Sequence, residues 1–178
     1  KVLAEMAVSA CGSLNPCNVA YLEGLKALPL DNARTDSFVK TLTAGDPNAK
    51  IVAQIEGGYA PDSGKKAAQD ALQANPDINV MVGSSQAILG AQSVVDTSKV
   101  KLIGNGSSTE AFAAVNAGKW YALYNMDVAG MGSKSVEFGL QQAAGTLTNP
   151  SFNTQTLRDP HGTKDVIAQY TATYSDLG

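Results

Sequence analysis

The stretch "NPDINVMVGSSQAILGA", residues 75–91, decides the fold class. A polar turn leads into a short apolar run at 79–82, which ends on a glycine and two serines at 83–85, and a helical pattern begins at Gln86. A buried strand that turns directly into a helix is typical of parallel sheets. Two explanations of the glycine and serines stay open. They are an ordinary helix N-cap, or the place where a small molecule is held.

The same strand-and-helix unit recurs along most of the chain. The strands are apolar throughout rather than at every second residue, which indicates a parallel sheet covered on both faces. Right-handed crossovers then give an α/β fold, a three-layer doubly wound parallel sheet. We expect strands over 18–24, 50–58, 79–82, 99–106 and 119–127, and helices over 30–45, 61–74, 107–118 and 129–145, with a further helix from 86.

Polar residues mark several helix starts. Asp31 and Asn32 are the candidate N-caps of the first of these helices, and Ser107 followed by Glu110 matches a capping box. The tail is less regular, and we expect it to contain an extended segment, a surface turn and a helix capped by Thr163, at 153–159, 160–162 and 163–174.

Length and composition limit the function. The 178 residues, 44% hydrophobic and 16% charged, fit a single globular domain. A net charge of -3 and the lack of a Lys/Arg run argue against nucleic acid as a partner. No apolar run approaches the length of a membrane span. The chain opens at Lys1 within "KVLAEMAV", whose spacing is roughly helical, so we expect a mature or truncated piece.

Two cysteines, Cys11 and Cys17, flank the polar loop of "CGSLNPC". Two unpaired thiols and a local disulfide both fit this spacing, and a disulfide would require an oxidising compartment. A metal site is disfavoured, because the one histidine, His161, lies far along the chain between a proline and a glycine.

Catalytic motifs are not found in the sequence. "GSSQA" lacks the closing glycine of the G-x-S-x-G nucleophile elbow, and "GNGSST" lacks the third glycine of a dinucleotide loop. A single histidine gives little support to a Ser-His-Asp or Cys-His site. We therefore expect a binding protein without a cofactor, and a small enzyme on the same fold is the minority alternative.

The candidate ligand site follows from the fold class. Doubly wound sheets bind ligands outside the carboxyl ends of their strands. The residues just after the five expected strands are small, polar or aromatic, and several are glycines that let a ligand approach the backbone. These segments are 23–25, 57–59, 83–85, 105–107 and 125–127.

A set of short motifs in a fixed order resembles one known family. "ANPDINVMVGSSQAILGAQSVV" and "VKLIGNGSSTEAFAAVNAGKWYALYNMDVAGMGSKSVEFGL" look like the second lobe of the type I periplasmic solute-binding proteins. These are the sugar receptors of ATP-binding-cassette importers. The match runs from about Asn18 to Gly145, and it is carried by 75–77, 90–91, Gly104, 116–119 and 131–132.

The resemblance implies a protein of two similar lobes that close on a ligand. Residues 1–178 would be a single α/β lobe, the C-terminal half without its N-terminal partner, and a helix over 128–145 would cross to the missing lobe. The implied partners are a sugar-like solute and the membrane subunits of the importer. The implied location is extracytoplasmic, in the periplasm or as a cell-surface lipoprotein.

The resemblance also implies ligand-binding positions. Arg34, four residues before Phe38, matches an arginine that donates to ligand hydroxyls, with a solvated or ion-paired arginine as the alternative. Tyr59 matches a loop aromatic that stacks on a sugar ring, with a half-buried loop tyrosine as the alternative. The remaining positions are Ser84, Ser85, Asn105, Gly106 and Asn125.

Several of these positions depart from the family pattern. Ser84 and Ser85 stand where the family has Asn-Asp, and Gly106 stands where it has Asp. The lost acids point away from a ribose-like or galactose-like ligand and toward a less hydroxylated sugar or another small polar metabolite. The alternative function is the effector-binding core of a LacI-type transcription regulator, which shares this fold. The closing segment "DVIAQYTATYSDLG" favours the receptor over that regulator.

Overall fold

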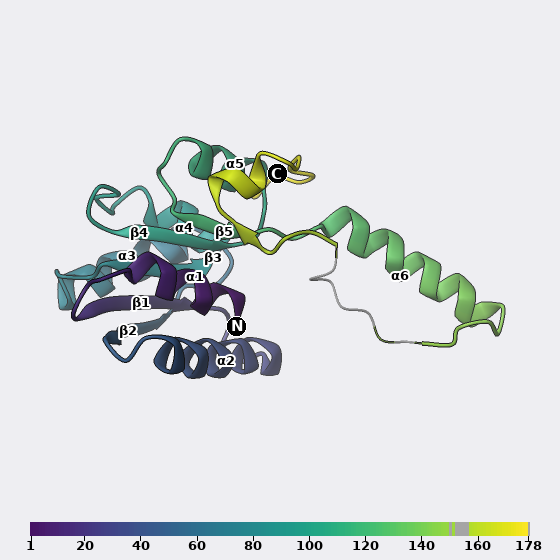
Figure 1. The fold of residues 1–178 in the computed structure, drawn as a ribbon, viewed down its shortest axis with the longest axis horizontal. Coiled ribbons are helices and arrows are strands. Elements are labelled where there is room, and N and C mark those ends of the chain that lie inside the picture. Colours follow the sequence, from purple (N-terminus) through teal and green to yellow (C-terminus); the bar gives the residue numbers. More distant parts are fainter. Residues whose placement is uncertain (150, 152–156, 178) are drawn as a thin grey trace.

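The computed structural model describes residues 1–149, 151 and 157–177, and strands alternate with helices along the chain from β1 to α6 (Figure 1). The strands are β1 (Cys17–Glu23), β2 (Ala49–Glu56), β3 (Val80–Ser84), β4 (Lys101–Asn105), β5 (Ala122–Tyr124) and β6 (His161–Gly162). The helices are α1 (Val2–Cys11), α2 (Pro29–Gly45), α3 (Pro61–Ala74), α4 (Ser85–Ala91), α5 (Thr109–Asn116), α6 (Val128–Ala143) and α7 (Lys164–Ile167).

The sheet has the strand order β2-β1-β3-β4-β5-β6. Strands β1 to β5 run parallel, and β6 pairs antiparallel with β5. The predicted α/β class with a parallel, doubly wound sheet is therefore confirmed. The antiparallel edge strand was not predicted, because its two residues, His161 and Gly162, read as a surface turn in the sequence.

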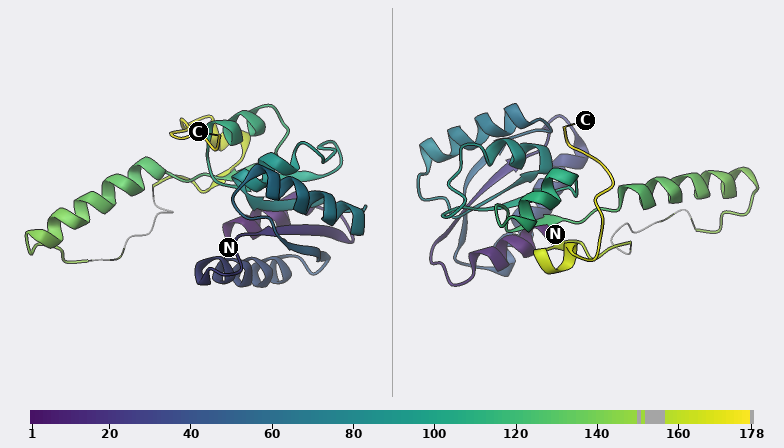
Figure 2. Two further views of the ribbon diagram at one scale, coloured as in Figure 1. Left: turned by 180° about the vertical axis from the view of Figure 1, so that it is seen from behind. Right: turned by 90° about the horizontal axis from the view of Figure 1, so that it is seen from above.

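Helices cover both faces of the sheet, and each face has its own core (Figure 2). Because side chains alternate along a strand, Val80 and Val82 of β3 face α1 and α2, whereas Met81 faces the side of α3, α4 and α5. The central strands β1 and β3 are buried along their whole length, which is why their sequences are largely apolar, whereas the edge strand β2 is only partly buried.

A disulfide joins Cys11, at the end of α1, to Cys17, at the start of β1, with an S–S distance of 2.09 Å. Both cysteines are buried in the core between α1, α2 and the sheet. Of the two alternatives that the sequence left open, the structure has the disulfide. It fixes α1 against the sheet, so that the first turn of α1 reaches the carboxyl ends of the strands.

Helix α6 projects away from the body in every view (Figures 1 and 2). None of its sixteen residues is buried. Two of its apolar side chains, Val136 and Leu140, are 64% and 67% exposed. An amphipathic helix normally gains its stability by packing an apolar face, and this one packs no face on the sheet.

Two predicted caps are wrong. Helix α2 begins at Pro29, and the Asp31 carboxylate accepts hydrogen bonds away from the helix start instead of capping it. Helix α5 is capped by Ser108, whose Oγ accepts from the Ala111 N–H at 3.1 Å, while the Ser107 hydroxyl donates to the Met126 carbonyl. Adjacent serines offer the same chemistry, so the sequence alone does not choose between them.

Two predicted elements are shorter than expected. Strand β5 covers three residues, because the N–H groups of Lys119 and Trp120 still bond to the α5 carbonyl of Ala114, and the Asn125 N–H bonds to Pro160. In the tail, α7 is a single turn, and the chain then runs over α5, where the Thr109 N–H donates to the Tyr174 carbonyl. Residues 153–156 of the expected extended segment lie outside the described residues.

Candidate functional site

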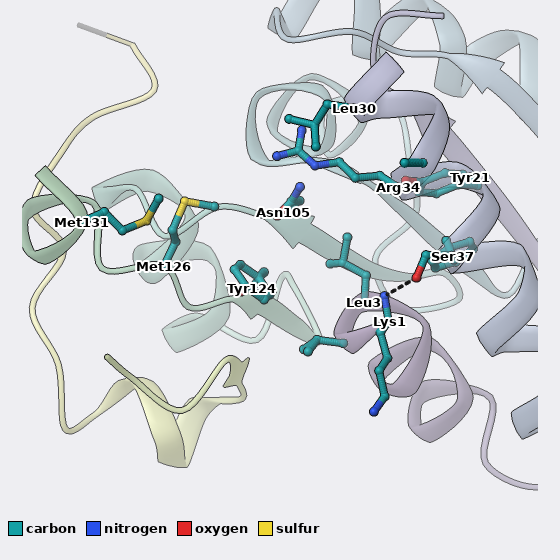
Figure 3. A pocket seen from close by; sticks show the side chains of 13 residues that line it. Lys1, Leu3, Tyr21, Leu30, Arg34, Ser37, Asn105, Tyr124, Met126 and Met131 are labelled. Carbon is teal, nitrogen blue, oxygen red and sulfur yellow. Dashed lines mark hydrogen bonds between the residues drawn. The ribbon is translucent and has the colours of Figure 1, made fainter. Parts of the chain in front are cut away.

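A cavity of about 400 Å³ opens at the carboxyl ends of the strands, on the α1 and α2 side of the sheet (Figure 3). Most of its wall is apolar or aromatic, from Leu3, Tyr21, Leu30, Phe38, Tyr124, Met126 and Met131, and its main polar groups come from Arg34, Ser37 and Asn105. Concave, mostly apolar sites with a few placed polar groups are the usual form of small-molecule sites.

A smaller recess adjoins the cavity. It is lined by four of the seven ligand-binding residues that the resemblance implied: Arg34, Tyr59, Ser84 and Asn105. Arg34 and Asn105 line both spaces, so they stand where the recess and the cavity meet. The structure thus brings these four residues together at one edge of the sheet, as the resemblance implied, and three of them lie at or just after the ends of strands.

Asp31 organises the arginine and the tyrosine of this site. Asp31 is 3% exposed, and its Oδ1 accepts from Arg34 Nη1 at 2.8 Å and from the Tyr59 hydroxyl at 2.6 Å. Its Oδ2 accepts from the Leu25 N–H at 2.9 Å, which joins the loop after β1 to the same carboxylate. Arg34 Nη1 also donates to the Tyr59 oxygen at 3.1 Å. Of the two alternatives for Arg34, the structure has the ion pair; Arg34 also lines the cavity, and its donation to a ligand stays a prediction.

Protonation states in this network follow from its contacts. Burial raises the pKa of Asp31, but the hydrogen bonds from Tyr59 and Leu25 and the Arg34 charge outweigh burial and leave it below its ordinary value. Burial and the hydrogen bond to Asp31 raise the pKa of Tyr59 to about 12. Near neutral pH, Asp31 is an anion and Tyr59 is a neutral donor, and no other described residue bonds to the Arg34 N–H groups beyond Nη1.

Asn105 and Ser84 contribute to the site in different ways. Among the described residues, no hydrogen bond engages the Asn105 side chain, which lies between Arg34 and the methionines of the cavity wall (Figure 3). The Ser84 hydroxyl donates to the Gly58 carbonyl at 2.7 Å and accepts from the Ala87 N–H at 3.0 Å. Ser84 is thus the N-cap of α4, whereas the side-chain amide of Asn105 lines the cavity and the recess with both its donor and its acceptor group.

The other three implied residues do not line either space. Ser85 and Gly106 are buried beneath Tyr174, whose hydroxyl accepts from the Ser107 N–H at 2.7 Å. Asn125 is 3% exposed, and its Nδ2 donates to the Asp159 carbonyl at 3.1 Å. The tail therefore covers positions that the sequence alone placed on an accessible rim.

Some of the site was missed in the sequence. Tyr21 and Phe38 stack with ring centroids 4.2 Å apart and form an aromatic wall of the cavity. Asp31 was read as a helix cap, although its position three residues before Arg34 is the spacing of a helical ion pair. Met126 and Met131 were not predicted as cavity-wall residues, although Met126 lies in the strand-end segment 125–127 and Met131 in the motif 131–132.

The sequence pattern that defines the periplasmic binding protein domain matches residues 1–147. The chain belongs to this family. Its members are binding proteins, and the family implies an extracytoplasmic location, which agrees with the Cys11–Cys17 disulfide. No curated protein matches the chain in sequence.

Solved structures of periplasmic binding proteins share the fold. An ABC transporter periplasmic solute-binding protein from Actinobacillus succinogenes 130z, with bound D-allose, superposes with a TM-score of 0.84 at 22% identity, over 95% of this chain and 60% of that one. The arabinose-binding protein AraP from Geobacillus stearothermophilus gives 0.71 at 22% identity, over 96% and 63%. A Bacillus halodurans C-125 solute-binding protein, with bound myo-inositol, gives 0.71 at 23% identity, over 81% and 52%.

The chain therefore spans 60% of the length of the Actinobacillus relative.

Within the part of the chain that the structure describes, no group of three or more His, Cys, Asp or Glu side chains is arranged to hold a metal ion. No described helix is long and apolar enough to cross a membrane.

Proposed function

We propose that this periplasmic binding protein domain binds a sugar-like solute and forms one lobe of a two-lobe receptor for an ABC importer. The observation that carries the proposal is the cavity at the carboxyl edge, where Arg34 is held in place by Asp31 beside an aromatic wall. A planar cation with free N–H groups suits paired hydroxyls, and an aromatic wall suits the apolar face of a ring.

The ligand that fits this lobe has a polar edge and an apolar face. Arg34 and Asn105 would bond the polar edge, while Tyr21, Leu30 and the methionines would contact the other face. The one acid that lines the recess, Asp31, already has three hydrogen bonds. This arrangement supports a less hydroxylated sugar or another small polar metabolite over a ligand that needs carboxylate acceptors.

Helix α6 supports the two-lobe arrangement. It carries exposed Val136 and Leu140 away from the sheet, where nothing within the described residues covers them. We infer that α6 and the adjoining chain pack on the N-terminal lobe and that this is the C-terminal lobe. Hinge closure would then bring the second lobe over the cavity, for recognition by the importer's membrane subunits. A lipoprotein anchor belongs to the same proposal.

Isothermal titration with D-allose, L-arabinose and myo-inositol tests the binding proposal. We expect at least one of them to bind, and Arg34→Ala to weaken that binding about tenfold or more, because a hydrogen bond to a charged group contributes about 1.5–3 kcal/mol. Lys40→Ala, an exposed cation on the same helix, is the control and should change nothing. Equal affinities for the wild type and Arg34→Ala would remove Arg34 from the site.

A further inference from the structure

The segment Tyr174–Leu177, which we call the strap, is fastened across the carboxyl ends of β3 and β4. Glu110 Oε1 accepts from the Ser175 hydroxyl at 2.6 Å, and its Oε2 accepts from the Asp176 N–H at 2.9 Å. Gln86 Nε2 donates to Asp176 Oδ1 at 2.7 Å. The strap is thus bound to the first turns of both α4 and α5.

Tyr174 is the residue of the strap that reaches the strand ends. Its hydroxyl accepts from the Ser107 N–H at 2.7 Å, and a Cβ added to Gly106 would lie 2.8 Å from the same oxygen. That added Cβ would also lie 2.5 Å from the Ser85 hydroxyl, so the tyrosine and the serine meet over the glycine. Small residues at positions 85 and 106 leave the space that the tyrosine occupies.

This contact divides the carboxyl edge. Asn105 and Ser84 line the recess on the α1 and α2 side, and the residues that follow them, Gly106 and Ser85, are buried on the side of the strap. We propose that Tyr174 is a specificity-determining residue, which confines the ligand to the Arg34 side and excludes substituents that extend past Asn105 toward Ser85. This inference rests on the proposed function, because it concerns the ligand of the same site.

A thiol reporter tests the closure without any ligand. Ser85→Cys introduces one free thiol, since Cys11 and Cys17 are bonded to each other. N-ethylmaleimide should label it slowly in the wild-type background and about tenfold faster or more with Tyr174→Ala, because labelling then no longer waits for local opening. Tyr170→Ala, which removes another tail aromatic that bonds to Asp159, is the matched control and should leave the rate unchanged. Equal rates with and without Tyr174 would overturn the proposal.

Hydrogen exchange keeps the test valid if the cysteine variant does not fold. The Ser107 amide donates to the Tyr174 side chain, whereas the Thr109 amide donates to the Tyr174 backbone. In Tyr174→Phe the Ser107 amide should exchange faster while the Thr109 amide stays protected. A Ser107 amide that exchanges equally fast in both proteins would show that the hydroxyl is not seated there, and would also overturn the proposal.

The selectivity of ligand binding is the decisive measurement. The ratio of dissociation constants for D-allose and its benzyl glycoside should shift about tenfold toward the glycoside in Tyr174→Ala, as expected when a pocket gains room. Tyr174→Phe, which keeps the ring, and Tyr170→Ala should both keep the wild-type ratio. Binding with an unchanged ratio in Tyr174→Ala would overturn this inference and leave the proposed function standing. If the wild type binds none of the sugars or myo-inositol, the proposed function fails, while thiol labelling still decides whether the strap closes the edge.

Discussion

The two sides of the sheet's carboxyl edge are completed in different ways. On the α1 and α2 side, Asp31 holds Arg34 and Tyr59 in a hydrogen-bonded network beside an open cavity. On the α4 and α5 side, the strap fills the corresponding space, and Ser85 lies beneath Tyr174 with 1% exposure. The strand-end rule identifies the edge, and segments distant in sequence decide which side of it a ligand can reach.

The difference also concerns where polar groups find their partners. On the open side, the buried Asp31 carboxylate orients Arg34 and Tyr59, and Arg34 has further N–H donors that no described residue occupies. On the closed side, Glu110 and backbone groups form hydrogen bonds with the strap, so most polar groups on this side already have partners. Most buried polar groups are paired, although Asp176 Oδ2 of the strap is buried with no partner among the described residues, and groups that are paired within the protein offer little to a ligand. Perturbing each side separately therefore tests this contrast.

The largest effect should come from Asp31→Ala on the open side. The substitution removes the acceptor for three hydrogen bonds and leaves Arg34 without its ion-pair partner. We expect the free energy of unfolding in urea to fall by about 3 kcal/mol, since three hydrogen-bond donors lose their acceptor and each such bond contributes about 1 kcal/mol. Asp62→Ala, an exposed acid in the first turn of α3, is the control and should stay within about 0.5 kcal/mol of the wild type.

The same variant should separate the two sides. With Asp31 replaced, the Ser107 amide should keep its protection from hydrogen exchange, because the strap makes no contact with Asp31. Loss of protection at Ser107 would show that the two sides form a single cooperative unit. Equal stability of Asp31→Ala and Asp62→Ala would refute the role given to the buried carboxylate.

A smaller effect is expected from Gly106→Ala on the closed side. Gly106 has φ 147°, which L side chains rarely adopt, and an added methyl would meet Ser85 and Tyr174. We expect about 1–2 kcal/mol of destabilisation in urea, and faster exchange of the Ser107 amide. Gly118→Ala is the control, because Gly118 has φ 70° but open space around it. If both variants expose Ser107 equally, backbone strain rather than displacement of the strap is responsible.

The fold could be predicted because it follows from local sequence patterns. Apolar strands such as 79–82, followed at once by a helix, repeat often enough to define a parallel sheet. The strand-end rule indicated the segments that contain Tyr59, Ser84 and Asn105, the family resemblance added Arg34, and the structure has all four around one recess. The fold inference uses signals between residues that are close in sequence, whereas the resemblance uses the order of short motifs along most of the chain.

The parts that could not be predicted depend on contacts between distant segments. Tyr174 covers Ser85 across 88 intervening positions in the chain, and no local pattern records that contact. Aspartate is a common helix N-cap, so the sequence favours that role for Asp31. Only the contact with Tyr59, from the loop after β2, shows that Asp31 organises the site instead. Helix α6 was predicted from its own sequence, but what it packs against lies beyond any pattern in that helix. Long-range packing overrides local preference at these places.

The smallest effect should come from acid titration of Glu110, which holds the strap. Burial raises the pKa of this carboxyl, but hydrogen bonds from Ser175 and Asp176 outweigh burial and lower it from 4.5 to about 2. Because the folded-state pKa lies below the unfolded value, the stabilisation is present above about pH 4.5 and is lost as the pH falls toward about 2. The hydrogen exchange of the Asp176 amide, relative to its intrinsic rate, should therefore accelerate over that pH interval.

The Glu110→Gln variant should show this faster exchange already at neutral pH, and its free energy of unfolding should fall by less than about 1 kcal/mol. Glu137→Gln on α6 should behave as the wild type. An Asp176 amide whose protection is the same in Glu110→Gln and in the wild type would place the anchor of the strap elsewhere, and the closed side would then depend on Tyr174 and Gln86.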